Sequence, residues 1–156
     1  MPKVISKKIP TKMYRKIYES MPILCVDLVV TDRTGKYFFL VKRDNKPERG
    51  KWWFPGGRVY KNEFLHQAVR RKLREETNLT GTIVKQIDMY DYRSTSQDGF
   101  FKGVNVHTLN VVFLVKAVMS RAVQLDTQSS DYGWFKKVDP AWSPYVKEFL
   151  RKAGFK

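Results

Sequence analysis

Residues 56–79 have the sequence GGRVYKNEFLHQAVRRKLREETNL, which carries more structural information than any other stretch of the 156-residue chain. It opens on two glycines, which adopt backbone angles that other residues resist and leave peptide groups accessible to a ligand. The segment 62–77 then predicts a helix, because its apolar residues recur at helical spacing. Asn62 suits the N-cap, and Asn78 can end the helix in a left-handed conformation. The stretch therefore predicts a glycine loop followed by an amphipathic helix.

Two adjacent carboxylates, Glu75 and Glu76, lie near the predicted end of this helix. They share a helix face with residue 72, because side chains three and four positions apart are neighbours. Paired carboxylates beside the free carbonyls of a glycine loop can bind a hard cation, and Mg²⁺ prefers oxygen ligands. The other interpretation is a solvated face of arginine and glutamate side chains. The helix by itself favours the solvated face.

The segments around this helix predict a mixed arrangement of strands and helices. Residues 23–30 (ILCVDLVV) form an apolar run typical of a buried strand, and a second strand at 37–43 completes a hairpin. Further strands are predicted at 82–93, 104–118 and 132–138, and further helices at 11–20 and 143–153. This order favours a single α/β domain over residues 1–156, built as an α+β sandwich rather than a doubly wound parallel sheet.

The spacing within residues 56–79 resembles the Nudix box, G-x5-E-x7-R-E-U-x-E-E-x-G-U, in which U is an apolar residue. The positions in register are Gly57, Glu63, Arg71, Leu73, Glu75, Glu76 and Leu79. Two positions depart from the pattern: Lys72 stands where the box has glutamate, and Asn78 stands where it has glycine. Because an ammonium replaces a third carboxylate, a site for two or three cations is not expected.

The resemblance implies a Nudix fold, in which a mixed central sheet lies between helices and the box forms a loop–helix–loop. It implies that Glu63 and Arg71 pair to brace the loop against the helix. One Mg²⁺, or Mn²⁺ in its place, is then expected on the backbone carbonyl of Gly56 and the carboxylate of Glu76. Glu75 is expected to be catalytic, either as a further metal ligand or through contact with one.

A second pattern is similar to that of the GDP-mannose mannosyl hydrolases within this superfamily. It runs from Pro22 to Asp27 and continues over Lys42, Arg43, Asn45, Pro47, Gly50, Trp52, Pro55, Gly56, Gly57, Arg58 and Val59. This resemblance implies hydrolysis of a GDP-sugar to GDP and free sugar, with cleavage of the sugar C1–O bond and inversion. It implies that Asp27 contacts the sugar, while Arg43 and Arg58 bind the diphosphate and offset its charge as it leaves.

Asp27 stands out on physical grounds as well, because it lies inside an otherwise apolar strand, where an unpaired carboxylate is costly. A substrate contact and an ion pair with a nearby lysine or arginine both account for it. Arg43 ends a strand and Arg58 follows the glycine pair, where a guanidinium can bind phosphate oxygens in a fork. The alternative for both is a solvated surface arginine.

The general base is the point at which the family pattern fails. The resemblance places a metal-binding glutamine at Gln128, but Ser129 stands where the family has its catalytic histidine. An unassisted serine is a poor base near neutral pH. His107 and Asp131 are the remaining candidates, although a lone strand histidine is more often structural.

The composition bears on partners and compartment. The formal charge of +15, from 30 Lys and Arg against 15 Asp and Glu, attracts anions, but the basic residues are spread widely. Nucleic-acid binding is therefore less favoured than nucleotide binding. The single cysteine, Cys25, excludes an internal disulfide, and no apolar run is long enough to span a membrane. With no recognisable secretory signal, these features favour a cytoplasmic protein, and the resemblance suggests a homodimer.

Three functions are consistent with these observations. The leading prediction is Mg²⁺-dependent hydrolysis of a GDP-sugar of the GDP-mannose type. The first alternative is a Nudix pyrophosphohydrolase that attacks phosphorus in a nucleoside diphosphate derivative or nucleoside triphosphate, which the serine at position 129 favours. The second alternative is a catalytically weak module that binds nucleotide or RNA. Phe100 and Phe101 either stack on a nucleobase or pack against a partner subunit.

Overall fold

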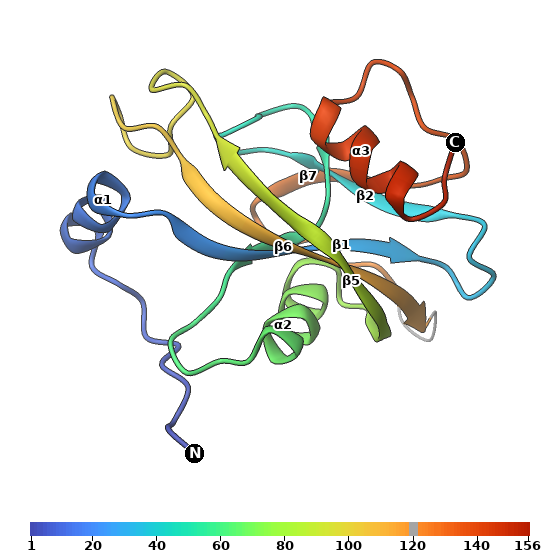
Figure 1. Cartoon of the computed structure of the whole chain (residues 1–156), viewed down its shortest axis with the longest axis horizontal. Helices are drawn as coiled ribbons and strands as arrows, with labels where there is room; N and C mark the ends of the chain where they lie inside the picture. Colours follow the sequence, from blue (N-terminus) through green and yellow to red (C-terminus); the bar gives the residue numbers. More distant parts are fainter. Residues whose placement is uncertain (119–121) are drawn as a thin grey trace.

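The computed structural model describes residues 1–118 and 122–156, which fold around a mixed β-sheet flanked by helices (Figure 1). The elements in chain order are α1 (Thr11–Ser20), β1 (Ile23–Thr31), β2 (Phe38–Arg43), β3 (Trp52–Trp53), β4 (Gly56–Arg58), α2 (Leu65–Thr77), β5 (Thr80–Arg93), β6 (His107–Val118), β7 (Ser129–Phe135) and α3 (Pro144–Lys152). Their types and order confirm the predicted α+β sandwich.

β1 lies at the centre of the sheet, whose described strands follow the order β3-β2-β1-β6-β5. It runs parallel to β6 along its whole length and antiparallel to β2 and β4, while β7 pairs with β2. A strand that is covered on both faces is apolar almost throughout, which explains the run of branched side chains at 23–30. The predicted hairpin of β1 and β2 is confirmed by the pairing of Val30 with Phe39.

The sequence does not predict β3 and β4, because strands of two and three residues carry no periodicity. β4 pairs with β1 so that Gly56 lies opposite Asp27. A Cβ atom at Gly56 would lie 2.1 Å from Oδ1 of Asp27, so only glycine permits this approach. The glycine loop is thereby attached to the central strand. Helix α2, which follows the loop in the Nudix-box segment, contacts the loop through Glu76.

Helices α2 and α3 cover opposite faces of the sheet (Figure 1). On one face α2 contributes Ala68, Val69 and Leu73 to the core, and on the other face α3 contributes Tyr145, Val146, Phe149 and Leu150. Side chains alternate along β1, so Val26 and Leu28 face α2 while Val29 faces α3. None of the described helices is long and apolar enough to cross a membrane.

The box helix α2 begins at Leu65, later than the predicted residue 62. Asn62 is therefore not its N-cap: it adopts a left-handed conformation, with φ 68°, in the preceding turn. The backbone amide of Phe64 donates instead to the side chain of Gln67 at 2.9 Å, which satisfies a free donor at the helix start. The other end agrees with the prediction, because Asn78 has φ 61° and ends the helix.

Candidate active site

A cavity of about 320 Å³ opens where β1, β4 and β6 meet α1, α2 and the loop 44–51. The predicted site residues that line it are Asp27, Arg43, Gly56, Gly57, Arg58, Arg71 and Gln128. Lys72 and Asn110 join them, which the sequence does not predict. Among the described residues, Glu63, Glu75 and Glu76 are predicted site residues outside this lining. The fold thus brings most of the predicted site together but separates the carboxylates of α2 from the cavity.

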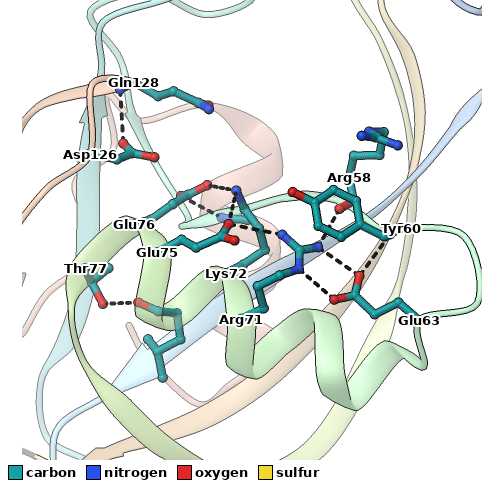
Figure 2. Close-up of polar contacts among 12 residues, drawn as sticks. Arg58, Tyr60, Glu63, Arg71, Lys72, Glu75, Glu76, Thr77, Asp126 and Gln128 are labelled. Atoms are coloured by element: carbon teal, nitrogen blue, oxygen red, sulfur yellow. Dashed lines mark hydrogen bonds and ion pairs between the residues drawn. The ribbon is translucent and has the colours of Figure 1, made fainter. Parts of the chain in front are cut away.

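Glu63 and Arg71 form a brace between the glycine loop and α2 (Figure 2). Nε and Nη2 of Arg71 donate to the two carboxylate oxygens of Glu63 at 2.6 and 2.8 Å, and Nη2 also donates to the carbonyl of Arg58. The amide of Tyr60 donates to Glu63 at 2.9 Å, and the guanidinium of Arg71 stacks on the Tyr60 ring. Burial raises the pKa of Glu63, but the hydrogen bonds from Arg71 and Tyr60 outweigh burial and lower the pKa below its usual value. Both charges of the brace are therefore satisfied inside the protein.

A second ion pair follows on the same helix, between Lys72 and Glu76 (Figure 2). Nζ of Lys72 lies 2.8 Å from Oε1 of Glu76 and 3.6 Å from Oε2 of Glu75. The side chains of Lys72 and Glu76 are only 10% and 6% exposed. Burial disfavours the ammonium form of Lys72, but the charge of Glu76 outweighs burial and raises the pKa of Lys72 above its usual value. The carboxylate predicted to bind a metal therefore binds a charged lysine.

This geometry does not fit a divalent ion at Glu76. Oε1 already contacts Lys72, and Oε2 accepts a hydrogen bond from the amide of Gly56 at 3.1 Å. Two cations that share one carboxylate lie about 4 Å apart, where an ion of charge two and an ammonium repel by roughly 8 kcal/mol at an effective dielectric constant of about 20. Within residues 1–118 and 122–156, no three His, Cys, Asp or Glu side chains gather closely enough to hold a metal ion. Binding of Mg²⁺ or Mn²⁺ by Gly56, Glu76 and Gln128 stays a prediction, and it requires Lys72 to move away.

Asp27 lies in the wall of the cavity and is 5% exposed. Its Oδ2 accepts hydrogen bonds from the side-chain amide of Asn110 on β6 and from the hydroxyl of Tyr145 on α3. Its hydrogen-bond partners are therefore neutral, rather than the lysine or arginine that the sequence left as an alternative. Burial raises the pKa of Asp27 to about 7, because the two hydrogen bonds offset only part of the desolvation. A carboxyl group that titrates near neutral pH can take up a proton during a reaction.

Arg43 and Arg58 line the same cavity from β2 and β4. Nε of Arg43 donates to the carbonyl of Pro47 at 2.6 Å, which fixes the guanidinium against the loop 44–51. The guanidinium of Arg58 lies 5.0 Å from the ring centre of Tyr60. Within the part of the chain that the structure describes, neither arginine forms an ion pair with a carboxylate. Their charge is therefore available to an anion in the cavity.

The described residues that line the cavity include neither of the candidate bases, Asp131 and His107, nor Ser129 at the position of the family histidine. His107 lies on β6 between two residues that do line it, so strand alternation directs its side chain to the other face. There Nε2 of His107 lies 2.9 Å from Oδ1 of Asp91. The contact with Asp91 outside the cavity favours a structural role for His107, the alternative that the sequence also favours.

Phe100 and Phe101 pack against α1 of the same chain. The ring centres of Phe101 and Tyr18 are 5.3 Å apart, and those of Phe101 and Tyr14 are 6.0 Å apart. Phe101 is thereby buried at 9% exposure, whereas Phe100 remains 51% exposed and lines the cavity. Phe101 therefore packs within its own chain. The ring of Phe100 is exposed beside the cavity, where stacking on a nucleobase stays a prediction.

A family model described as NUDIX domain matches residues 21–152. The chain is 31% identical over 144 residues to the low-salt glycan biosynthesis protein Agl8 of Haloferax volcanii, covering 92% of this chain and 89% of that protein. It is also 31% identical over 116 residues to the ADP-ribose pyrophosphatase of Methanocaldococcus jannaschii, covering 74% of this chain and 62% of that protein. The solved structure of MutT protein from Methanosarcina mazei Go1 is similar in fold, with a TM-score of 0.68 and 22% identity over 86% of this chain and 94% of that one.

A mixed sheet between two helices, with a braced glycine loop and box helix beside a cavity, defines the class of Nudix-fold proteins. The family match and the long alignment to a curated relative make the particular assignment: the chain belongs to the NUDIX domain family. The expectation of a Nudix hydrolase is supported by the same comparisons.

Proposed function

We propose that the chain hydrolyses a nucleoside diphosphate sugar of the GDP-mannose type to the nucleoside diphosphate and the free sugar. The observation that carries this proposal is that a buried carboxyl, Asp27, shares one cavity with Arg43 and Arg58. A carboxyl that titrates near neutral pH suits the reaction at the sugar, and two guanidinium groups suit the diphosphate. Similarity to a protein named for glycan biosynthesis supports a substrate that contains a sugar.

In the proposed reaction, the carboxylate of Asp27 accepts a proton from water as the water oxygen attacks C1 of the sugar. The C1–O bond breaks, its electron pair leaves with the diphosphate, and Arg43 and Arg58 offset the charge that develops. Asn110 and Tyr145 orient Asp27 through their hydrogen bonds to Oδ2. Attack from the face opposite to the leaving group inverts the configuration at C1.

A second candidate is a pyrophosphohydrolase, in which water attacks phosphorus of a nucleoside diphosphate derivative. Similarity to a protein named ADP-ribose pyrophosphatase favours it, as does Ser129 in place of the family histidine. Hydrolysis in ¹⁸O-labelled water separates the two reactions. Label in the sugar supports C–O cleavage, whereas label in the phosphate supports attack at phosphorus.

The proposal is tested by turnover of GDP-, UDP- and ADP-sugars, each with and without Mg²⁺, which also tests the predicted metal dependence. Asp27→Asn is expected to lower kcat by roughly 100-fold or more, because the variant keeps the side-chain size and loses the proton acceptor. Asp91→Asn is the matched control, since Asp91 is exposed and pairs with His107 away from the cavity. Equal turnover by the two variants would contradict the role of Asp27, and no turnover across the panel would contradict the function.

A further inference from the structure

The charged groups that α2 presents to the cavity are cations rather than carboxylates: Arg71, which pairs with Glu63, and Lys72. Lys72 lines the cavity, but the described lining residues do not include Glu75 or Glu76. Nζ of Lys72 lies 2.8 Å from Oε1 of Glu76 and 3.6 Å from Oε2 of Glu75. Of these three side chains, the one that lines the cavity and can contact a ligand there is that of Lys72.

The position of the Lys72 side chain depends on the glycine loop. A Cβ atom at Gly57 would lie 2.8 Å from Cε and 3.1 Å from Nζ of Lys72, so a side chain at position 57 would displace the lysine. Lysines are rarely buried unless they are paired, and the side chain of Lys72 is only 10% exposed. Glycine on one side and Glu76 on the other thus form a fitted site for one ammonium group.

We propose that Lys72 is the resident cation of this site: its ammonium takes the place of a divalent ion at Glu76 and binds the diphosphate together with Arg43 and Arg58. The diphosphate as ligand rests on the proposed function, whereas the replacement of the ion rests on the geometry of Lys72. An ammonium has three N–H donors, and among the described residues the only carboxylate within 3 Å of this one is that of Glu76. Lysine binds phosphate as a point charge, so the remaining donors suit phosphate oxygens at the edge of the cavity.

The replacement of the ion is tested by the binding of Mn²⁺ alone, with no nucleotide present. Electron paramagnetic resonance measures free Mn²⁺ in solutions of the wild type, Lys72→Glu and Arg74→Glu. Lys72→Glu restores the carboxylate of the box pattern, and Arg74→Glu makes the same change of charge at an exposed position of α2. We expect Lys72→Glu to bind one ion per chain at concentrations where the wild type and Arg74→Glu bind none. A wild-type affinity within about threefold of that of Lys72→Glu would overturn the proposal.

The role toward the diphosphate is tested by calorimetric titration with GDP and with ADP in EDTA. The wild-type affinity is expected to change by less than about threefold when Mg²⁺ replaces EDTA, and Lys72→Met is expected to lose about tenfold or more. Arg74→Met is the matched control and should bind like the wild type. If Lys72→Met does not fold, Lys72→Met/Glu76→Gln removes both charges and gives the same comparison. Loss of wild-type binding in EDTA, or equal binding by Lys72→Met and Arg74→Met, would overturn the proposal.

Failure of this inference and failure of the proposed function give different results. A wild type that binds Mn²⁺ and hydrolyses nucleotide sugars contradicts the role of Lys72 and leaves the function in place. A wild type that binds GDP in EDTA, excludes Mn²⁺ and hydrolyses no nucleotide sugar supports Lys72 as resident cation and contradicts the function.

Discussion

Two ion pairs that involve consecutive residues of α2, Arg71 and Lys72, differ in what they leave for a ligand. In the brace, Arg71 donates to both oxygens of Glu63, to the carbonyl of Arg58 and to the side chain of Glu75, and Glu63 also accepts from the amide of Tyr60. The pair of Lys72 and Glu76 is also buried, and Arg71 and Lys72 both line the cavity. The two cations differ in their hydrogen bonds, because Arg71 donates four to the protein whereas Lys72 has one carboxylate within 3 Å. Burial alone therefore does not decide the role of an ion pair. A pair whose hydrogen bonds are completed inside the protein supports the loop, whereas a pair with donors beside a cavity can bind a ligand.

Breaking the brace is expected to have the largest effect on stability. Arg71→Met should lower the free energy of unfolding by about 4 kcal/mol, because the carboxylate of Glu63, 4% exposed, loses its cation. Arg74→Met, on the exposed face of the same helix, should change it by less than about 0.5 kcal/mol. Urea unfolding followed by circular dichroism measures both. Similar losses in the two variants would show that the brace has no structural role.

Asp27 extends the comparison to a buried acid whose partners are neutral, and its effect depends on pH. The pKa of Asp27 is about 7 in the folded state and 3.8 for an unperturbed aspartate. At pH values between these two, the folded state binds a proton that the unfolded state has released. The stability from this proton is complete below about pH 4 and is lost as the pH rises through about 7. Between about pH 5 and pH 8 the loss amounts to roughly 3 kcal/mol.

This loss should be absent in Asp27→Asn, which has no proton to release, and present in Asp91→Asn, which keeps Asp27. Urea unfolding of the wild type and both variants at several pH values measures it. Parallel pH dependences in the wild type and Asp27→Asn would mean that the folded state does not perturb this carboxyl group.

The features that the sequence predicts here are those set by local spacing. Glu63 and Arg71 are eight positions apart, a separation that a loop followed by two helical turns converts into contact. Asn78 ends the helix because asparagine tolerates the left-handed region, which requires no knowledge of distant residues. The apolar run of β1 predicts a buried central strand for the same local reason.

The features that the sequence does not predict depend on distant segments. Asp27 receives its hydrogen bonds from Asn110 and Tyr145, which lie 83 and 118 positions away. Asn110 was detectable by the same criterion as Asp27, since it is a polar side chain inside an apolar strand, but no local pattern joins the two. Lys72 could equally have extended into solvent as a surface lysine. It turns inward because Gly57 leaves space beside Glu76, and that space exists only after β4 has paired with β1.

A double-mutant cycle measures the coupling energy between Lys72 and Glu76, the second ion pair. This effect on stability is expected to be intermediate in size among those predicted here. Lys72→Met and Glu76→Gln each leave a buried charge without its partner, whereas the double variant removes both charges. The two losses should therefore not add, and the coupling energy should be about 2 kcal/mol in urea unfolding at neutral pH in EDTA. A coupling below about 0.5 kcal/mol would mean that Lys72 does not depend on Glu76 for its position.

The smallest effect is expected at Glu75, which contacts both pairs: Oε2 lies 3.1 Å from Nη1 of Arg71 and 3.6 Å from Nζ of Lys72. Its side chain is 44% exposed, so water screens both contacts and Glu75→Gln should lower the free energy of unfolding by less than about 1 kcal/mol. The catalytic role predicted for Glu75 adds a second measurement, of kcat. If Glu75 acts only by positioning Lys72, a loss of that size corresponds to less than about tenfold in rate. A decrease in kcat as large as that in Asp27→Asn would mean that Glu75 contacts the reacting atoms. The distinction between a structural pair at Arg71 and a ligand-binding pair at Lys72 would then be wrong, because Glu75 contacts both cations and would itself be catalytic.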